Sequence, residues 1–101
     1  MAAVEPRVLT LQIDKIQSGL YRAELQLRGD PIADPVVYSR ISEAIREEAE
    51  SVHVDFAQFI EVRYYELSSG TIPLGLVSGQ AEEIAERLVG LLHEMHLIAG
   101  S

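Results

Sequence analysis

Hydrophobic and polar residues alternate along two separate stretches of this chain, and a glycine-containing loop interrupts each of them. In the first stretch, the odd positions of 9–13 and 21–27 are apolar on either side of the loop at 17–19. Alternation with a period of two is typical of a strand that buries one face. A three-residue loop pairs Leu11 with Leu25, so that apolar residues face each other across the hairpin. The pattern predicts a β-hairpin whose odd positions point into a core.

The second stretch has the same pattern on its even positions. Residues 60–64 and 72–76 alternate around the loop at 68–70. The same loop geometry pairs Val62 with Leu76, again apolar with apolar. We therefore expect a second hairpin whose even positions point into the same core.

Each hairpin leads into an amphipathic helix. Asp34 is a favourable N-cap and Pro35 suits the first turn, so the first helix is predicted from there to about Glu50. Glu48 falls close to its apolar stripe, where a buried carboxylate needs a partner. Ser78 is expected to cap the second helix. The apolar face of that helix comprises Ile84, Leu88, Leu91, Leu92, Met95 and Ile98.

These elements predict an α+β fold in the order β-β-α-β-β-α. We expect a four-stranded, mainly antiparallel sheet with both helices packed on one face. The 101 residues have the size of a single domain. The likeness of 7–50 to 52–98 indicates an internal repeat, although strand alternation alone produces most of the agreement. Whether 52–56 forms a separate strand is left open.

Charge and composition narrow the function. The formal net charge is −8, and the excess acid lies in the two predicted helical segments. An acidic surface repels phosphate backbones, so nucleic-acid binding is disfavoured. The chain has no cysteine, which excludes disulfides and thiolate metal sites. No signal-peptide pattern and no apolar run of about 20 residues is present, so we expect a cytoplasmic protein that does not enter a membrane.

Three histidines are the candidates for chemistry. His93 and His96 are three residues apart on a predicted helix, a spacing that chelates metal less specifically than the four-residue spacing of zinc-binding helices. His53 and Asp55 project to the same side if their segment is extended, as an acid–histidine dyad would. Both pairs have an ordinary explanation as surface residues, and the sequence predicts no cofactor.

The sheet face opposite the helices is the candidate interface. Its expected residues mix apolar, aromatic and arginine side chains, a composition enriched at protein interfaces. That face must meet solvent, a ligand or another subunit. The interface residues predicted on it and at its edge are Val8, Leu20, Arg22, Arg63, Tyr65, Pro73 and Val77.

Our leading hypothesis is a small, acidic, non-enzymatic module that binds a protein partner or a second copy of itself. It would act through the open sheet face or an edge strand. The alternative is a small-ligand or metal-binding protein that uses His93 and His96, or His53 and Asp55. A third hypothesis is mimicry of nucleic acid by the helical glutamates Glu43, Glu47, Glu50, Glu82, Glu83 and Glu86.

Overall fold

The computed structural model describes the backbone of residues 6–99 and the side chains of residues 6–96. Ile98, predicted on the apolar face of the last helix, therefore has a side chain outside the described part. The elements follow in the order β1 (Val8–Gln17), β2 (Leu20–Leu27), β3 (Asp30–Pro31), β4 (Val36–Tyr38), α1 (Ile41–Ser51), β5 (Phe59–Tyr64), β6 (Leu67–Pro73), α2 (Leu74–Val77), a 3-10 turn (Ser78–Gln80) and α3 (Ala81–Ala99).

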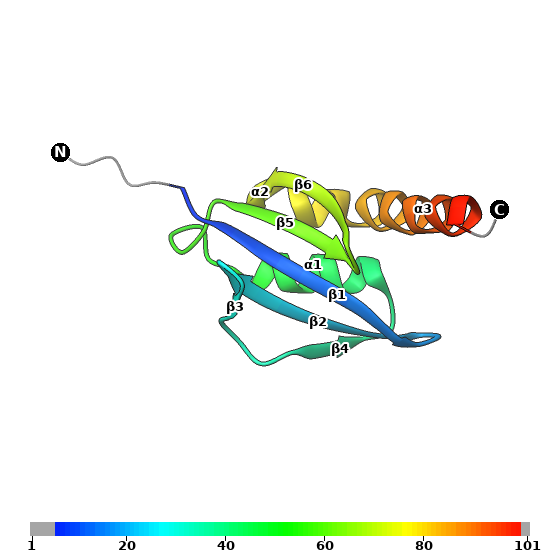
Figure 1. The fold of residues 1–101 in the computed structure, drawn as a ribbon. Coiled ribbons are helices and arrows are strands. Elements are labelled where there is room, and N and C mark those ends of the chain that lie inside the picture. Colours follow the sequence, from blue (N-terminus) through cyan, green and yellow to red (C-terminus); the bar gives the residue numbers. More distant parts are fainter. Residues whose placement is uncertain (1–5, 100–101) are drawn as a thin grey trace.

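The strands form one mixed sheet, which confirms the α+β class but not the expected four-stranded antiparallel arrangement. The strand order is β3-β2-β1-β5-β6, and β4 also pairs with β2. The central neighbours β1 and β5 are parallel, whereas the other pairs are antiparallel. The connection through α1 carries the chain from β2 to the other side of β1 (Figure 1). A helical crossover of this kind is what parallel neighbours require.

The register of the first hairpin is confirmed. Leu11 lies opposite Leu25, and both side chains are buried. The hairpin closes at Ser18 and Gly19, where Gly19 has a φ of 76°. A positive φ of this kind costs glycine little because it has no Cβ. Turn chemistry and face pattern therefore specify the same register here.

The predicted register of the second hairpin is wrong. The chain already reverses at Tyr65 and Glu66, so that Tyr64 lies opposite Leu67. Tyr65 takes a φ of 54°, an uncommon conformation for a bulky residue. The strand then ends at Pro73, and the following residues are helical. Leu76 is 52% exposed on α2 and does not pair with the buried Val62.

The residues expected to form that turn make a bulge inside β6 instead. The pairing register shifts between Glu61 and Arg63, and Gly70 has a φ of 77°. The Val62 N–H donates to Ser69 Oγ at 2.9 Å, so a side-chain oxygen replaces a backbone acceptor. A Ser-Gly pair satisfies the geometry of a bulge as well as that of a turn, which is why the sequence signal was misread.

The first helix begins later than predicted. Residues 36–38 form the short strand β4 beside β2, and α1 starts only at Ile41. Valine and tyrosine favour strands, and this preference overrides the capping signal at Asp34 and Pro35. The Tyr38 hydroxyl donates to Glu48 Oε2 at 2.6 Å. Tyr38 is therefore the partner of the Glu48 carboxylate, which is buried rather than at the rim of the helix.

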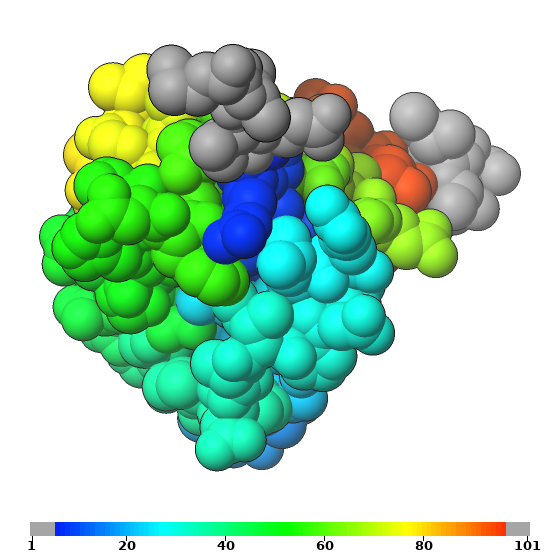
Figure 2. All heavy atoms as spheres, turned by 90° about the vertical axis from the view of Figure 1, so that its left-hand side faces the viewer, coloured from blue at the N-terminus to red at the C-terminus, as the bar shows by residue number. Residues whose placement is uncertain are grey.

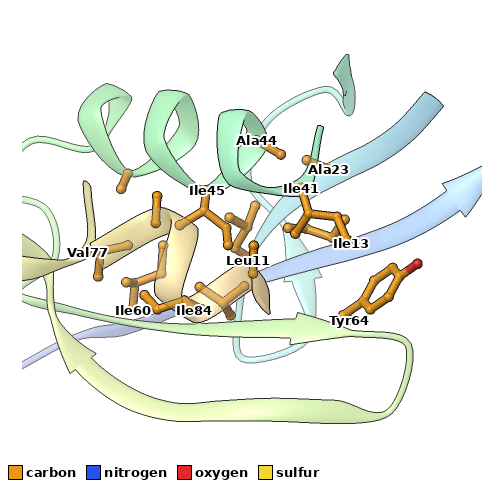
Figure 3. Packing of buried hydrophobic residues seen from close by; sticks show 14 of the residues in the cluster. Leu11, Ile13, Ala23, Ile41, Ala44, Ile45, Ile60, Tyr64, Val77 and Ile84 are labelled. Atoms are coloured by element: carbon orange, nitrogen blue, oxygen red, sulfur yellow. The ribbon is translucent and has the colours of Figure 1, made fainter. Parts of the chain in front are cut away.

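One cluster of buried residues joins the sheet to the helices. The inward residues of β1, β2 and β5 pack against those of α1, α2 and α3 (Figure 3). Both long helices therefore cover the same sheet face, as expected. Ser78 lies within a continuous run of helical residues and does not cap α3. The connection between α1 and β5, which includes residues 52–56, contains no strand among the described residues. At this end of the molecule the connection (green) and the β3–β4 segment (cyan) flank the start of β1 (blue; Figure 2).

Candidate interaction surface

The open sheet face is covered by hydrogen bonds among its own polar side chains. Arg22 forms a 3.0 Å ion pair with Glu24, which also accepts from Gln26 Nε2 at 2.9 Å. Gln12 Nε2 donates to the Tyr65 carbonyl at 3.0 Å and to Asp14 Oδ1 at 3.3 Å. Such a surface meets water without a partner, as one face of an antiparallel sheet commonly does.

The predicted interface residues do not gather into one patch. Val8 and Pro73 are exposed at one end of the sheet, on either side of Phe59, whereas Leu20 and Arg22 lie toward the other end. Leu20, Arg22 and Arg63 are half-buried. Tyr65 lies in the β5–β6 turn with its ring centroid 4.7 Å from that of Tyr64. Val77 is fully buried in the core, so its predicted place on the open face is wrong. The open face therefore lacks the apolar centre that an interface needs.

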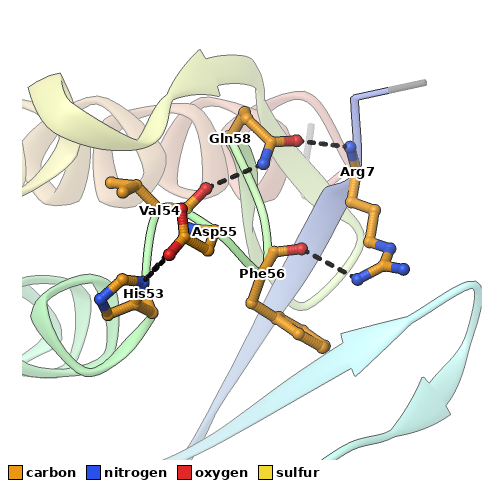
Figure 4. A network of polar contacts seen from close by, with 6 residues as sticks. All are labelled: Arg7, His53, Val54, Asp55, Phe56 and Gln58. Atoms are coloured by element: carbon orange, nitrogen blue, oxygen red, sulfur yellow. Dashed lines mark hydrogen bonds and ion pairs between the residues drawn. The ribbon is translucent and has the colours of Figure 1, made fainter. Parts of the chain in front are cut away.

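The His53–Asp55 pair is formed but belongs to an exposed loop. His53 Nδ1 lies 3.4 Å from Asp55 Oδ2, and the two side chains are 75% and 89% exposed. The Asp55 backbone N–H donates to the same Nδ1 at 3.2 Å, so this nitrogen acts as an acceptor. Arg7 closes the loop from outside by donating to the Phe56 carbonyl at 3.3 Å (Figure 4). These contacts shape a loop and enclose no substrate.

The two helical histidines lie against different surroundings. His93 lines a hollow between α1 and α3, whereas His96 lines a second hollow beside the β5–β6 turn. Within residues 6–96, no three acidic or histidine side chains are placed to hold a metal ion together. The structure therefore does not bring His93 and His96 together with a third ligand.

The largest change of environment along any element occurs within α3. In its first half, Ala81, Ile84 and Leu88 are buried in the core. The same stripe continues at Leu91 and Met95, which recur at the alternating three- and four-residue spacing of a helical seam. These two side chains are 38% and 46% exposed. We call residues 89–96 the α3 overhang.

The overhang exists because α3 is longer than the strands beneath it. Nineteen residues of helix extend about 28 Å. The six residues of β5 extend only about 20 Å. The end of α3 accordingly runs past the ends of β5 and β6 (Figure 1). Apolar side chains beyond that point have no sheet beneath them.

A hollow of about 570 Å³ lies beside the overhang. Its walls are the β5–β6 turn on one side and α3 on the other, and its lining residues are Lys15, Tyr64, Tyr65, Glu66, Leu67, Leu92, Met95 and His96. Burial raises the pKa of Tyr64 to about 12, with smaller contributions in the same direction from the neighbouring Tyr65 and Tyr21. The Tyr64 hydroxyl therefore stays protonated at neutral pH and presents an uncharged aromatic wall.

The hollow that His93 lines, between α1 and α3, has a volume of about 580 Å³ and lies on the other side of α3. It is lined by the start of α1, by Tyr21 and by α3 residues that include Val89, Gly90 and His93. Val89 is 46% exposed there. The overhang thus presents apolar side chains on two sides, which is broader than the stripe that a single core contact needs.

The charges around the overhang are balanced, unlike those of the chain as a whole. The charged residues that line the two hollows are the bases Lys15 and Arg40 and the acids Glu66 and Glu86, and Arg87 and Glu94 lie beside them on α3. The whole chain has twice as many acids as bases, 16 against 8. The surroundings of the overhang therefore lack the negative excess that the first turn of α3 carries.

Comparison of the chain with known protein families, with curated proteins and with solved structures finds no match in any of the three. Along the described residues, no helix is both long enough and apolar enough to cross a bilayer. The site must therefore be judged on its own geometry.

The sequence predicts Leu91, Leu92 and Met95 on the buried face of the last helix because they continue its apolar stripe. The structure confirms this for Leu92, which is half-buried and packs against the core, but not for Leu91 and Met95. What distinguishes them is the point at which β5 turns back into β6, and the pattern of α3 itself carries no sign of that point.

Proposed function

We propose that this protein is a non-enzymatic protein-interaction module whose contact surface is the α3 overhang. The observation that carries the proposal is the continuation of the core stripe at Leu91 and Met95 into a region that the described chain covers only in part. Clustered apolar side chains on a protein surface mark interaction sites more often than isolated ones do. The two tyrosine- and helix-lined hollows beside the overhang add concave, aromatic surface of the kind enriched at interfaces.

The open sheet face is a weaker basis for the same function. Its polar groups are already paired within the chain, as in the Arg22–Glu24–Gln26 network. A partner there would have to break or desolvate these contacts, which costs free energy. At the overhang, by contrast, a partner would remove apolar surface from water, which contributes about 25 cal/mol per Å². This difference favours α3 over the sheet as the contact surface.

A paired measurement of stability and self-association tests the proposal. Leu91→Ser together with Met95→Ser is expected to change the free energy of unfolding by less than about 1 kcal/mol, because both side chains are already exposed. The same variant should lose association in sedimentation velocity at high protein concentration. Leu76→Ser is the matched control, since Leu76 is 52% exposed on α2 outside the overhang. A loss of several kcal/mol in the double variant would place these residues in the core and contradict the proposal.

The hollow beside the β5–β6 turn supports a second candidate function, binding of a small apolar ligand. Its volume of about 570 Å³ falls in the range of ligand pockets. Tyr65, Leu92 and Met95 supply apolar walls, and His96 and Lys15 supply polar groups at the rim. Fluorescence titration with anilinonaphthalene sulfonate, repeated with Leu92→Asp, tests this candidate. Binding that is unchanged in the variant would remove it.

A further inference from the structure

We infer that the occupant of the α3 overhang is a second copy of this chain, with the two α3 helices packed antiparallel about a two-fold axis near Leu91. The inference rests on the proposed function and specifies its partner. A two-fold axis is the commonest symmetry of soluble oligomers and requires a surface that is complementary to itself. The overhang meets this requirement in both charge and spacing.

The charge balance identifies where two copies can approach. The chain carries a formal charge of −8, so most of its surface repels another copy. Around the overhang the bases Lys15, Arg40 and Arg87 match the acids Glu66, Glu86 and Glu94 in number. A contact made elsewhere, for example between the glutamate-rich faces of α1, would oppose like charges. Self-association at the overhang therefore meets less repulsion than at the glutamate-rich faces of α1.

The order of residues along α3 then sets the direction of the partner. Arg87 and Glu94 are both exposed and lie on the same flank of the helix, four residues before and three residues after Leu91. A two-fold axis near Leu91 exchanges the two positions in an antiparallel pair. Arg87 then faces Glu94 of the partner copy, and Glu94 faces its Arg87. Neither residue forms an ion pair within 4.0 Å inside the described part of the chain.

A parallel arrangement lacks this match. Parallel helices related by a two-fold axis hold each residue at the height of its own equivalent. Arg87 and Glu94 would then each lie level with their own equivalents but on opposite flanks of the contact, so the two residues would form no pair across it. The antiparallel pair is therefore the arrangement that the sequence of α3 selects.

The contact is small, which sets the expected affinity. From residue 89 to the end of α3 the helix extends only about 16 Å. A stable interface buries about 800 Å² on each partner, and smaller contacts form weak complexes. We accordingly expect a dimer that forms reversibly as the protein concentration rises. Leu91 and Met95 lie at the centre of its contact and hold the two copies together.

A charge-swap series tests the inference directly. Arg87→Glu and Glu94→Arg, each alone, should weaken dimerisation by about tenfold or more, because each replaces two attractive pairs by two repulsive ones. The double variant restores both pairs in the opposite sense and keeps the net charge of the natural chain. It should dimerise within a few-fold of that chain in sedimentation velocity over a concentration series. Arg46→Glu and Glu47→Arg on α1 are controls for the change in net charge and should have little effect.

The outcomes separate the inference from the proposed function. If Leu91→Ser with Met95→Ser abolishes dimerisation but the double charge swap does not restore it, the antiparallel arrangement is overturned and the contact surface stands. If dimerisation survives loss of both apolar side chains, the overhang is not the contact. A chain that remains monomeric at the highest concentration overturns the second copy as the partner. The inference is supported only if the double charge swap restores dimerisation.

Discussion

The two halves of α3 carry one apolar stripe but meet different surroundings. In the first half, Ile84 and Leu88 pack against the sheet and α1 as part of the common core. In the second half, Leu91 and Met95 continue the stripe at the same spacing but are 38% and 46% exposed. Hydrophobic periodicity therefore establishes that a helix has an apolar face. It does not establish what covers that face.

The difference arises from the strands rather than from the helix. The strand β5 ends at Tyr64, and the chain turns back at once into β6. The helix has no such constraint and continues without a break past this point (Figure 1). Apolar residues at the end of such a helix gain less from folding than those over the sheet. The proposed association would remove them from water.

The largest expected effect comes from comparing one leucine in each half of α3. Leu88→Ala should lower the free energy of unfolding by about 2–5 kcal/mol, because Leu88 is fully buried and leaves a cavity. Leu91→Ala should lower it by less than about 1 kcal/mol at a concentration where the protein is monomeric. Urea denaturation of both variants gives the comparison. Equal losses would mean that the two halves share one environment.

The tyrosine at the boundary between the halves gives a pH-dependent effect. Burial raises the pKa of Tyr64 to about 12 from an ordinary value of 10.0, so its contribution to stability is complete below pH 10. Between pH 10 and 12 the unfolded chain releases the proton more readily than the folded one. Stability should therefore fall across this window, by an amount on the order of 1–3 kcal/mol.

Unfolding measured at several alkaline pH values tests this expectation. Tyr64→Phe should reduce the fall in stability without removing it, because Tyr38 also contributes. Burial and the hydrogen bond to Glu48 raise the pKa of Tyr38 as well. An unchanged pH dependence in Tyr64→Phe would show that the Tyr64 hydroxyl is not buried under α3.

A smaller effect is expected at the junction of the two halves. Gly90 is the one glycine within the described helical residues of α3, and a Cβ at this position would meet no other atom within 4 Å. Gly90→Ala should therefore raise the free energy of unfolding by about 0.5–1 kcal/mol, the difference in helix propensity. Thermal unfolding at low protein concentration measures it. A loss of stability would indicate that α3 is not a regular helix across the junction.

The two hairpins show how far the sequence predicts this fold. In the first, the loop glycine and the alternating faces agree on one register, and the structure has that register. In the second, Ser69 and Gly70 look like a turn but form a bulge, while Tyr65 takes the positive φ with no glycine to signal it. Local signals that fit two geometries cannot choose between them. The choice depends on contacts with β1, which is distant in sequence.

The candidate site was predictable only in part. Composition indicated an acidic interaction module, and the apolar residues of α3 were identified, but they were assigned to the core. The open sheet face is predicted as the interface from its mixture of apolar, aromatic and arginine residues, but Val77, one of those residues, is buried in the core. Strand order and strand length decide which apolar residues remain exposed. Neither is set by the pattern of a single element.

Amide hydrogen exchange along α3, measured at a low and a high protein concentration, tests the central claim most directly. Exchange reports the local opening of each helical turn. The account predicts that amides of residues 91–96 exchange more slowly at the high concentration, while those of residues 81–88 keep the same protection at both. Protection of residues 91–96 that does not depend on concentration would contradict self-association through the overhang.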